Sequence, residues 1–166
     1  MRTGIALGSN LGDRLANLRA ARAAIAGLAE VRPPLLSAPL VESEAVDCEP
    51  GTPAFLNSVI EVTFDGHPMT LLDALRAIEV KLGRPSKHPR NVSRLIDLDV
   101  LYVGNLALRN EEIVIPHPRL HRRRFVLEPL AAIRPELILP GQIGSVTQLL
   151  GRLPSNRATR TVATEW

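Results

Sequence analysis

The stretch FLNSVIEVTF at residues 55–64 is rich in β-branched residues and nearly alternates between apolar and polar side chains. This pattern is typical of a strand that packs one face on a core. The stretch RLIDLDVLYVGN at residues 94–105 shows similar alternation and predicts a second strand over 95–103, with a turn at 104–105. Two strands of this kind favour an antiparallel sheet.

Two helices are expected from stripes of apolar residues at spacings of three and four. The first stripe runs from Leu15 to Leu28; the second begins after Thr70, the expected N-cap, and ends at Gly83. The other expected elements are a strand at 3–8, weakly extended chain at 35–46, loops at 47–54 and 84–93, helices at 123–133 and 146–153, and a short strand at 137–140. Strands and helices interleave, which favours an α+β fold with helices on one or both faces of the sheet.

The length of 166 residues predicts a single domain spanning 1–166, with a weakly ordered tail after residue 154. Hydrophobic residues make up 45% and charged residues 22% of the chain, which is ordinary for a soluble globular protein. The one cysteine, Cys48, cannot form an internal disulfide, which fits a reducing compartment. No apolar run could span a bilayer, and the N-terminus lacks a signal-peptide core. We therefore expect a cytoplasmic protein that does not contact membranes.

Positive charge is concentrated in two clusters, although the formal net charge is only +3. The clusters flank the strand expected at 95–103. They consist of Arg84, Lys87, His88, Arg90 and Arg94 before it, and of Arg119, His121, Arg122, Arg123 and Arg124 after it. Such clusters indicate an anionic partner, either the phosphates of a nucleotide or a nucleic acid.

Asp97 and Asp99 interrupt this strand, although Asp is a poor strand former and is costly to bury unpaired. The alternation places them on one face, with Cα atoms roughly 6–7 Å apart, and places Ile96, Leu98, Val100 and Tyr102 on the other. The pair could lie on a solvent-exposed face with arginine partners. Alternatively, it could bind Mg2+, which is typically held by one or two carboxylates together with substrate phosphates. Flanking arginines would then bind the remaining phosphate charge, because the chain has no GxxxxGK[ST] loop to do so.

Several motifs occur in an order and spacing that resemble the 6-hydroxymethyl-7,8-dihydropterin pyrophosphokinases of folate biosynthesis. They are ALGSNLGD at 6–13, FLNSV at 55–59, IEVKLGR at 78–84, R-x-x-D-L-D at 94–99, IPHPRL at 115–120 and RRFVLEPLAAIRPE at 123–136. Each motif alone is weak, whereas the ordered set is specific and covers most of the chain. The resemblance implies a ferredoxin-like α+β fold, in which helices pack on both faces of an antiparallel sheet.

The resemblance also implies an activity, the transfer of diphosphate from ATP to the hydroxymethyl group of the pterin with release of AMP. Asp97 and Asp99 would hold two Mg2+ ions, and together with Arg84 and Arg94 they would be the catalytic residues. The other residues implied in ATP binding are Arg76, Glu79, Lys87, Arg90, Val100, His117 and Arg123. Those implied in pterin binding are Glu44, Ala45, Asp47, Phe55, Asn57 and Phe125. The chain departs from the family pattern at Ala45, Asn91 and Val92.

Three of these residues have simpler interpretations when each is taken singly. Phe125 on a helix would more often belong to a core, His117 between prolines would more often be a loop histidine, and Asn57 could cap a bulge. Only the ordered set of motifs favours the binding roles.

The partners implied by the resemblance are ATP and the pterin, bound by a monomer that does not contact nucleic acid. A competing interpretation is a small basic module that binds nucleic acid without catalysis, with an affinity that falls steeply with salt. Against it, aromatics make up only 3% of the chain, and an aspartate pair without a metal would repel phosphate. A third interpretation is another Asp-x-Asp enzyme, such as a nucleotide-sugar glycosyltransferase, although such enzymes are normally longer than this chain.

Overall fold

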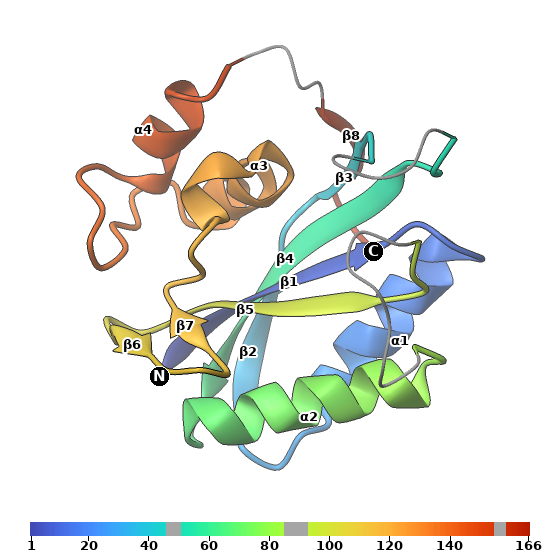
Figure 1. Cartoon of the computed structure of the whole chain (residues 1–166), viewed down its shortest axis with the longest axis horizontal. Helices are drawn as coiled ribbons and strands as arrows, with labels where there is room; N and C mark the ends of the chain where they lie inside the picture. The colour runs from blue at the N-terminus through green and yellow to red at the C-terminus, as the bar shows by residue number, and fades with distance from the viewer. Residues whose placement is uncertain (46–50, 85–92, 155–158) are drawn as a thin grey trace.

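A computed structural model describes residues 1–45, 51–84, 93–154 and 159–166 (Figure 1). In these ranges the strands are β1 Arg2–Ser9, β2 Val31–Ser37, β3 Leu40–Ser43, β4 Phe55–Phe64, β5 Asp97–Val103, β6 Leu108–Arg109, β7 Val114–Ile115 and β8 Thr159–Ala163. The helices are α1 Arg14–Ala26, α2 Pro68–Lys81, the 3-10 turn η1 Leu120–Arg122, α3 Arg124–Ile133 and α4 Val146–Gly151. Over the same ranges, no helix combines the length and the apolar character needed to cross a membrane. The site predictions for Asp47, Lys87 and Arg90 fall outside the described residues.

The main sheet has the strand order β5-β1-β4-β3-β8, and β2 also pairs with β4. The pairings in this sheet are antiparallel, as predicted, and β1 lies between β4 and β5. Along the chain, β1, α1, β2, β4, α2 and β5 follow the β-α-β-β-α-β order of the ferredoxin-like fold. That predicted fold class is therefore confirmed.

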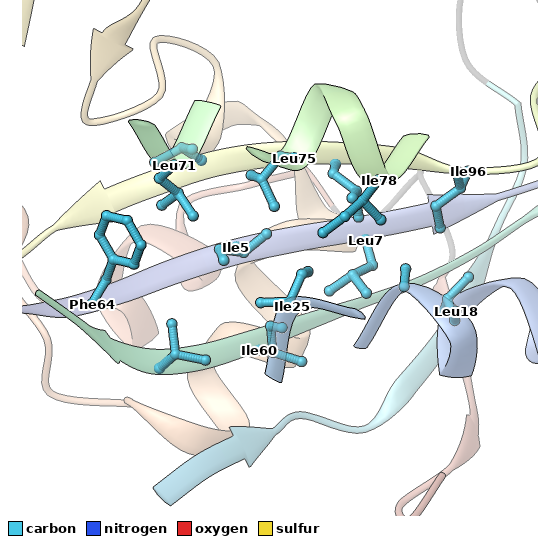
Figure 2. Packing of buried hydrophobic residues seen from close by; sticks show 14 of the residues in the cluster. Ile5, Leu7, Leu18, Ile25, Ile60, Phe64, Leu71, Leu75, Ile78 and Ile96 are labelled. Carbon is cyan, nitrogen blue, oxygen red and sulfur yellow. The ribbon is translucent and has the colours of Figure 1, made fainter. Parts of the chain in front are cut away.

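Helices cover both faces of the sheet (Figure 1). Figure 2 shows the core on the first face, where Leu18 of α1 and Leu75 of α2 pack against Ile5 and other side chains of the strands. On the second face α3, backed by α4, covers Val59 of β4 and Leu101 of β5. The sheet therefore separates two apolar cores, one on each face. The candidate site lies on the second face.

The first turn of α2 differs from the prediction. Thr70 is not the N-cap; the helix begins three residues earlier, where Nδ1 of His67 accepts a hydrogen bond from the Met69 N–H at 3.2 Å. Pro68 occupies the first helical position, where its missing N–H leaves no donor unsatisfied. α1 follows its predicted stripe, and Asp13 caps it by accepting from the Ala16 N–H at 3.0 Å.

β5 contains an irregularity that its alternating pattern did not reveal. The register with β1 shifts, so that Ile5 lies opposite Val100 but Gly4 lies opposite Tyr102, which leaves Leu101 as an extra residue. The prediction that Tyr102 shares a face with Val100 is therefore wrong. Tyr102 packs with Leu101 in the core under α3, whereas Val100 belongs to the core under α1 and α2.

The C-terminal part of the chain departs from the predicted elements. Residues 137–140 form no strand, because the Leu137 N–H bonds the Arg134 carbonyl and the Leu137 carbonyl accepts from Val146, as in a turn-rich connection. Residues 159–163, in contrast, form β8, which the sequence pattern did not predict and which pairs with β3. Beyond it, Nε1 of Trp166 donates to the Ala38 carbonyl at 2.8 Å.

Candidate active site

The two halves of the candidate site meet at Gly8 on β1. Gly8 is paired with Asn57 of β4 on one side and with Asp97 of β5 on the other. Directly opposed residues of neighbouring antiparallel strands turn their side chains to the same face, so Asn57 and Asp97 flank Gly8. A Cβ atom at position 8 would lie 3.0 Å from Oδ1 of Asn57, so glycine keeps the space between the two side chains open. We call these three residues the Gly8 row.

Asp97 is paired with two arginines, which lie immediately before and after residues 85–93. Oδ1 of Asp97 lies 2.7 Å from Nη1 of Arg84 and 2.9 Å from Nη1 of Arg94. The arginine side chains are 11% and 18% exposed, whereas that of Asp97 is 29% exposed. The carboxylate therefore retains solvent access, while its cationic partners are largely enclosed.

Asp99, two residues further along β5, is paired with Arg123 at 3.2 Å and lies 3.8 Å from Nε2 of His117. Nδ1 of His117 accepts a hydrogen bond from the Arg119 N–H at 3.1 Å, which places the ring proton on Nε2, facing Asp99. Burial lowers the pKa of His117, and the attraction of Asp99 offsets this only in part. His117 is therefore a neutral donor at this site. We call Asp97, Asp99 and their three arginine partners the aspartate cluster.

Glu79 connects α2 to the outer edge of the sheet. Its Oε1 atom accepts from the Leu98 N–H at 2.7 Å and also pairs with Nη1 of Arg84, the group that contacts Asp97. Burial raises the pKa of Glu79, against the opposing effect of these hydrogen bonds. Glu79 thus orients Arg84 toward Asp97, and its expected contact with ATP stays a prediction.

The predicted pterin residues lie on the other side of Gly8. Asn57 is buried, and its Nδ2 donates to Oγ of Ser43 at 2.9 Å. Phe55 begins β4 opposite Ser43, and Phe125 lies in the first turn of α3; both rings are half-buried. The Arg123 guanidinium lies 5.6 Å from the centre of the Phe125 ring, so one arginine contacts both Phe125 and Asp99.

Some predicted residues lie further from the aspartate cluster. Arg76 is on the exposed surface of α2 and pairs with Glu112, in the connection between β6 and β7, at 3.1 Å. Val100 is buried in the core under α1 and α2, so its predicted contact with ATP concerns its backbone. Glu44 and Ala45 follow directly after β3, and Glu44 is exposed.

The aspartates fit a metal ion that arrives with a phosphate substrate. Among the described residues, no group of three or more His, Cys, Asp or Glu side chains could hold a metal ion. Two carboxylates suit a hard divalent cation whose remaining ligands are phosphate oxygens and water. The cations paired with Asp97 and Asp99 are arginines, whose charge a metal ion would replace.

Three residues around the site were not predicted from the sequence: Asn10, Ser43 and Arg14. Asn10 is buried directly after β1, and Ser43 accepts the hydrogen bond that orients Asn57. Arg14 donates to the Ala54 carbonyl at 2.8 Å and pairs with Glu42 at 2.7 Å, so it joins both ends of the segment between β3 and β4. The motif ALGSNLGD contains Asn10, but its polar residues indicated only a turn and a helix cap.

Comparison with known sequences identifies relatives of this chain. The family model for 7,8-dihydro-6-hydroxymethylpterin-pyrophosphokinase matches residues 4–135. The 2-amino-4-hydroxy-6-hydroxymethyldihydropteridine pyrophosphokinase of Bacillus subtilis is 39% identical over 129 residues, which is 78% of this chain and 75% of the relative. The protein of the same name from Haemophilus influenzae is 37% identical over 136 residues, covering 82% and 83%. The folic acid synthesis protein fol1 of Schizosaccharomyces pombe is 33% identical over 91% of this chain, but this chain spans only 20% of that protein.

Solved structures agree on the fold. A crystal structure of HPPK-DHPS in complex with substrates has a TM-score of 0.69 at 12% identity, covering 90% of this chain and 43% of that one. Wild-type Plasmodium falciparum HPPK-DHPS with pteroate has a TM-score of 0.68 at 13% identity, covering 91% and 42%. At such identity these likenesses show the fold alone, whereas the sequence matches show the family. The chain belongs to the 7,8-dihydro-6-hydroxymethylpterin-pyrophosphokinase family.

Proposed function

We infer that the chain is a pyrophosphokinase of folate biosynthesis, which transfers diphosphate from ATP to the hydroxymethyl group of 6-hydroxymethyl-7,8-dihydropterin. The relatives from Bacillus subtilis and Haemophilus influenzae bear the name of this activity. The observation that carries the inference is the Gly8 row, where Asn57 and Asp97 lie two strands apart. Two strand spacings are roughly 10 Å, enough for a pterin ring bound by the amide to bring its hydroxymethyl group to the aspartates.

The proposed reaction at this site forms one bond and breaks another. The hydroxymethyl oxygen forms a bond to the β-phosphorus of ATP, and the bond from that phosphorus to the oxygen shared with the α-phosphate breaks. AMP leaves with the electron pair, and the proton of the hydroxyl group passes to water. Most of the catalysis in such a transfer comes from positioning and from stabilising charge on the phosphate oxygens, which suits a site built from arginines.

Charge balance supports a divalent metal requirement, which we propose is met by two Mg2+ ions held by Asp97 and Asp99. Three carboxylates, those of Glu79, Asp97 and Asp99, are paired with the guanidinium groups of Arg84, Arg94 and Arg123, so the aspartate cluster together with Glu79 carries no net charge. ATP brings about four negative charges, and two divalent ions compensate them. Such ions would supply positive charge that offsets the phosphate charge as it shifts during the transfer. The arginines, released from the carboxylates, can then bind phosphate oxygens in the bidentate geometry that guanidinium favours.

The remaining predicted contacts keep their roles in this proposal. His117 faces Asp99 with a neutral N–H group and would donate it to a phosphate oxygen of ATP. Phe125 and Phe55 would cover the pterin ring while the Asn57 amide pairs with its polar edge. Arg76, Glu79 and the backbone of Val100 would contact ATP from α2 and β5. Lys87, Arg90 and Asp47 belong to the same proposal from sequence alone.

We also propose that the chain acts in the cytoplasm as a single-domain monomer without nucleic acid. Binding of single-stranded nucleic acid normally uses exposed aromatic side chains as stacking platforms. The five aromatic residues of this chain are Phe55, Phe64, Tyr102, Phe125 and Trp166, and each is buried or half-buried. The arginines nearest the expected phosphate site are, moreover, paired with carboxylates.

The test is product analysis after mixing the protein with ATP, Mg2+ and 6-hydroxymethyl-7,8-dihydropterin. AMP and a pterin diphosphate in equal amounts are expected. ADP as the nucleotide product would indicate transfer of a single phosphoryl group and would contradict the proposal, as would the absence of any turnover by folded protein. Omission of divalent metal should abolish the product.

A further inference from the structure

Asn10 makes four hydrogen bonds to two segments that lie far from it in the sequence. It follows β1 directly and is 2% exposed. Its Nδ2 group donates to the Pro53 carbonyl at 3.2 Å and to Oγ of Ser93 at 3.1 Å. Its Oδ1 atom accepts from the Arg94 N–H at 2.7 Å, and its own backbone N–H donates to the Arg94 carbonyl at 3.1 Å. Three of these four bonds are made by the side chain.

The two segments belong to opposite halves of the proposed active site, the pterin half and the metal-binding half. Pro53 lies two residues before Phe55, at the entrance to the strand that bears Asn57. Arg94, in turn, is paired through its side chain with Asp97 at 2.9 Å. Asn10 is therefore bonded on one side to the pterin half of the site and on the other to the arginine that faces the metal-binding half.

We propose that Asn10 is a positioning residue, which fixes the pterin-binding strand entrance and the Arg94 backbone relative to each other so that the hydroxymethyl group and the ATP phosphates meet in line. This inference rests on the function proposed above. Asn10 itself lies beneath both segments and need not touch either substrate.

The chemistry of the amide suits this task. A side-chain amide is neutral and offers two N–H donors and one accepting oxygen, which matches the two acceptors and one donor that face Asn10. A carboxylate would lose the donors, and a serine hydroxyl could not serve three partners at once. Because reacting groups must be held within a fraction of an ångström, misplacement by about 1 Å costs on the order of 100-fold in rate.

Arg14, unlike Asn10, holds only one half of the site. Arg14 also binds the segment before β4, through the Ala54 carbonyl and Glu42, but none of these bonds reaches Arg94. A residue that holds only one half of the site would alter pterin binding alone. A residue that joins both halves should alter pterin binding and the rate of transfer together, and should leave ATP binding unchanged.

The experiment compares Asn10→Ala with Asn17→Ala. Asn17 is an asparagine of α1 that donates only to the nearby end of β1 and the connection after it, at Oγ of Ser9 and the Leu11 carbonyl. In Asn10→Ala we expect kcat to fall on the order of 100-fold and the Kd of the pterin to rise about 10-fold, with the Kd of ATP unchanged. Asn17→Ala should leave all three constants near wild type. Equal constants in the two variants would overturn the inference, as would equal weakening of ATP and pterin binding.

A double-mutant cycle with Arg94→Lys tests whether the rate effect passes through Arg94. If Asn10 acts by placing that arginine, the loss of kcat from Asn10→Ala should be several-fold smaller in the Arg94→Lys background. Full additivity would overturn this link. Should Asn10→Ala fail to fold, Asn10→Asp provides the test, because it keeps an acceptor for the Arg94 N–H and loses the donors. It should recover kcat better than pterin affinity, and unaltered pterin affinity would contradict the proposal.

Different results would contradict the proposed function and the positioning role of Asn10. If the wild-type protein forms no AMP from ATP and the pterin, the proposed function is wrong. If the wild-type protein is active and the Asn10 variants behave like Asn17→Ala, only the positioning role is wrong.

Discussion

Two groups of carboxylates and arginines lie on the same face of the sheet, four residues apart along β1. Beside Gly8 is the aspartate cluster. Beside Gly4 is a second group, the Glu61 cluster, in which the Glu61 carboxylate accepts from the Tyr102 hydroxyl at 2.5 Å and pairs with Arg134 at 2.5 Å. The side chain of Glu61 is 5% exposed, whereas those of Asp97 and Asp99 are 29% and 35% exposed.

The difference between the two clusters agrees with the proposal that the Glu61 cluster is structural and the aspartate cluster is functional. In the Glu61 cluster Tyr102 and Arg134 both donate to the one carboxylate of Glu61, which is nearly buried. In the aspartate cluster, Arg84 is shared between Glu79 and Asp97, and Asp97 is shared between two arginines. Such shared and partly exposed pairs contribute little to stability, and they can exchange partners when phosphate and metal bind. Mutations should therefore separate activity from stability.

The largest expected effect is on activity, in Asp97→Asn. Loss of this carboxylate removes a ligand of the proposed metal ion, and kcat should fall on the order of 1000-fold. The free energy of unfolding should change by about 1 kcal/mol or less, because the Asp97 carboxylate keeps solvent access and Arg84 stays paired with Glu79. Steady-state assay of AMP and urea denaturation measure the two quantities. Asp65→Asn, which removes an exposed partner of Arg32 at 3.0 Å, is the matched control and should alter neither. Undiminished turnover in Asp97→Asn would mean that the aspartate cluster is not the reaction centre.

The next effect is on stability, in Glu61→Gln. The substitution leaves Arg134 without its anionic partner in a nearly buried site, and we expect a loss of about 2 kcal/mol, because Arg134 itself keeps some solvent access. The kcat of the folded protein should stay within about 2-fold of wild type, since none of the three side chains belongs to the proposed site. Glu112→Gln, which removes the exposed partner of Arg76, should cost less than about 0.5 kcal/mol. A stability loss no larger than that of Glu112→Gln would contradict the structural assignment of the Glu61 cluster.

The same glycine-to-alanine substitution, made at Gly4 or at Gly8 of β1, tests the difference between the Glu61 cluster and the aspartate cluster. At Gly4 an added Cβ would lie 2.2 Å from the Tyr102 ring, so Gly4→Ala should displace the ring and cost about 1–2 kcal/mol. At Gly8 the added Cβ would lie 3.0 Å from Oδ1 of Asn57, so Gly8→Ala should raise the Kd of the pterin about 10-fold, with little loss of stability. Pterin titration and thermal unfolding of both variants test the contrast. Identical losses of stability and affinity in the two variants would remove the distinction between the clusters.

The sequence predicted those features that depend on local pattern. α1 and β4 lie where their patterns placed them, although β4 is buried on both faces over residues 56–62 rather than on one. Tyr102 was predicted on the wrong face because β5 contains one extra residue, which turns the side chains of the residues after it to the opposite face. Alternation alone does not show where a strand contains an extra residue. β8 was missed because its partner β3 lies more than a hundred residues earlier, so nothing local distinguishes it from an irregular tail.

The site shows the same division. Asp97, Asp99, Arg84 and Arg94 lie close together in the sequence, and the structure brings them together. Asn10 could not be found in this way, because its hydrogen-bond partners lie 43 and 83–84 residues away in the sequence. No local sequence pattern indicates contacts over such separations. Likewise, the pairing of Gly8 with both Asn57 and Asp97 is a property of strand order. Sequence reasoning therefore found charged residues that lie near one another along the chain better than Asn10 and the Gly8 pairing, whose partners lie far away in the sequence.

The smallest expected effect is the pH dependence of the Glu61 cluster. Burial by itself would raise the pKa of Glu61, but hydrogen bonds from Arg134 and Tyr102 outweigh it, and the pKa lies below the ordinary value of 4.5. A lowered pKa in the folded state means that the unfolded chain binds the proton more readily, so the stabilisation is complete above about pH 5.5 and is lost as the pH falls through the folded pKa. The stability advantage of the wild type over Glu61→Gln should therefore shrink by up to about 1 kcal/mol between pH 7 and pH 4. Urea denaturation at a series of pH values measures it, and an advantage that grows on acidification would show that the Glu61 carboxylate is not held ionised by its partners.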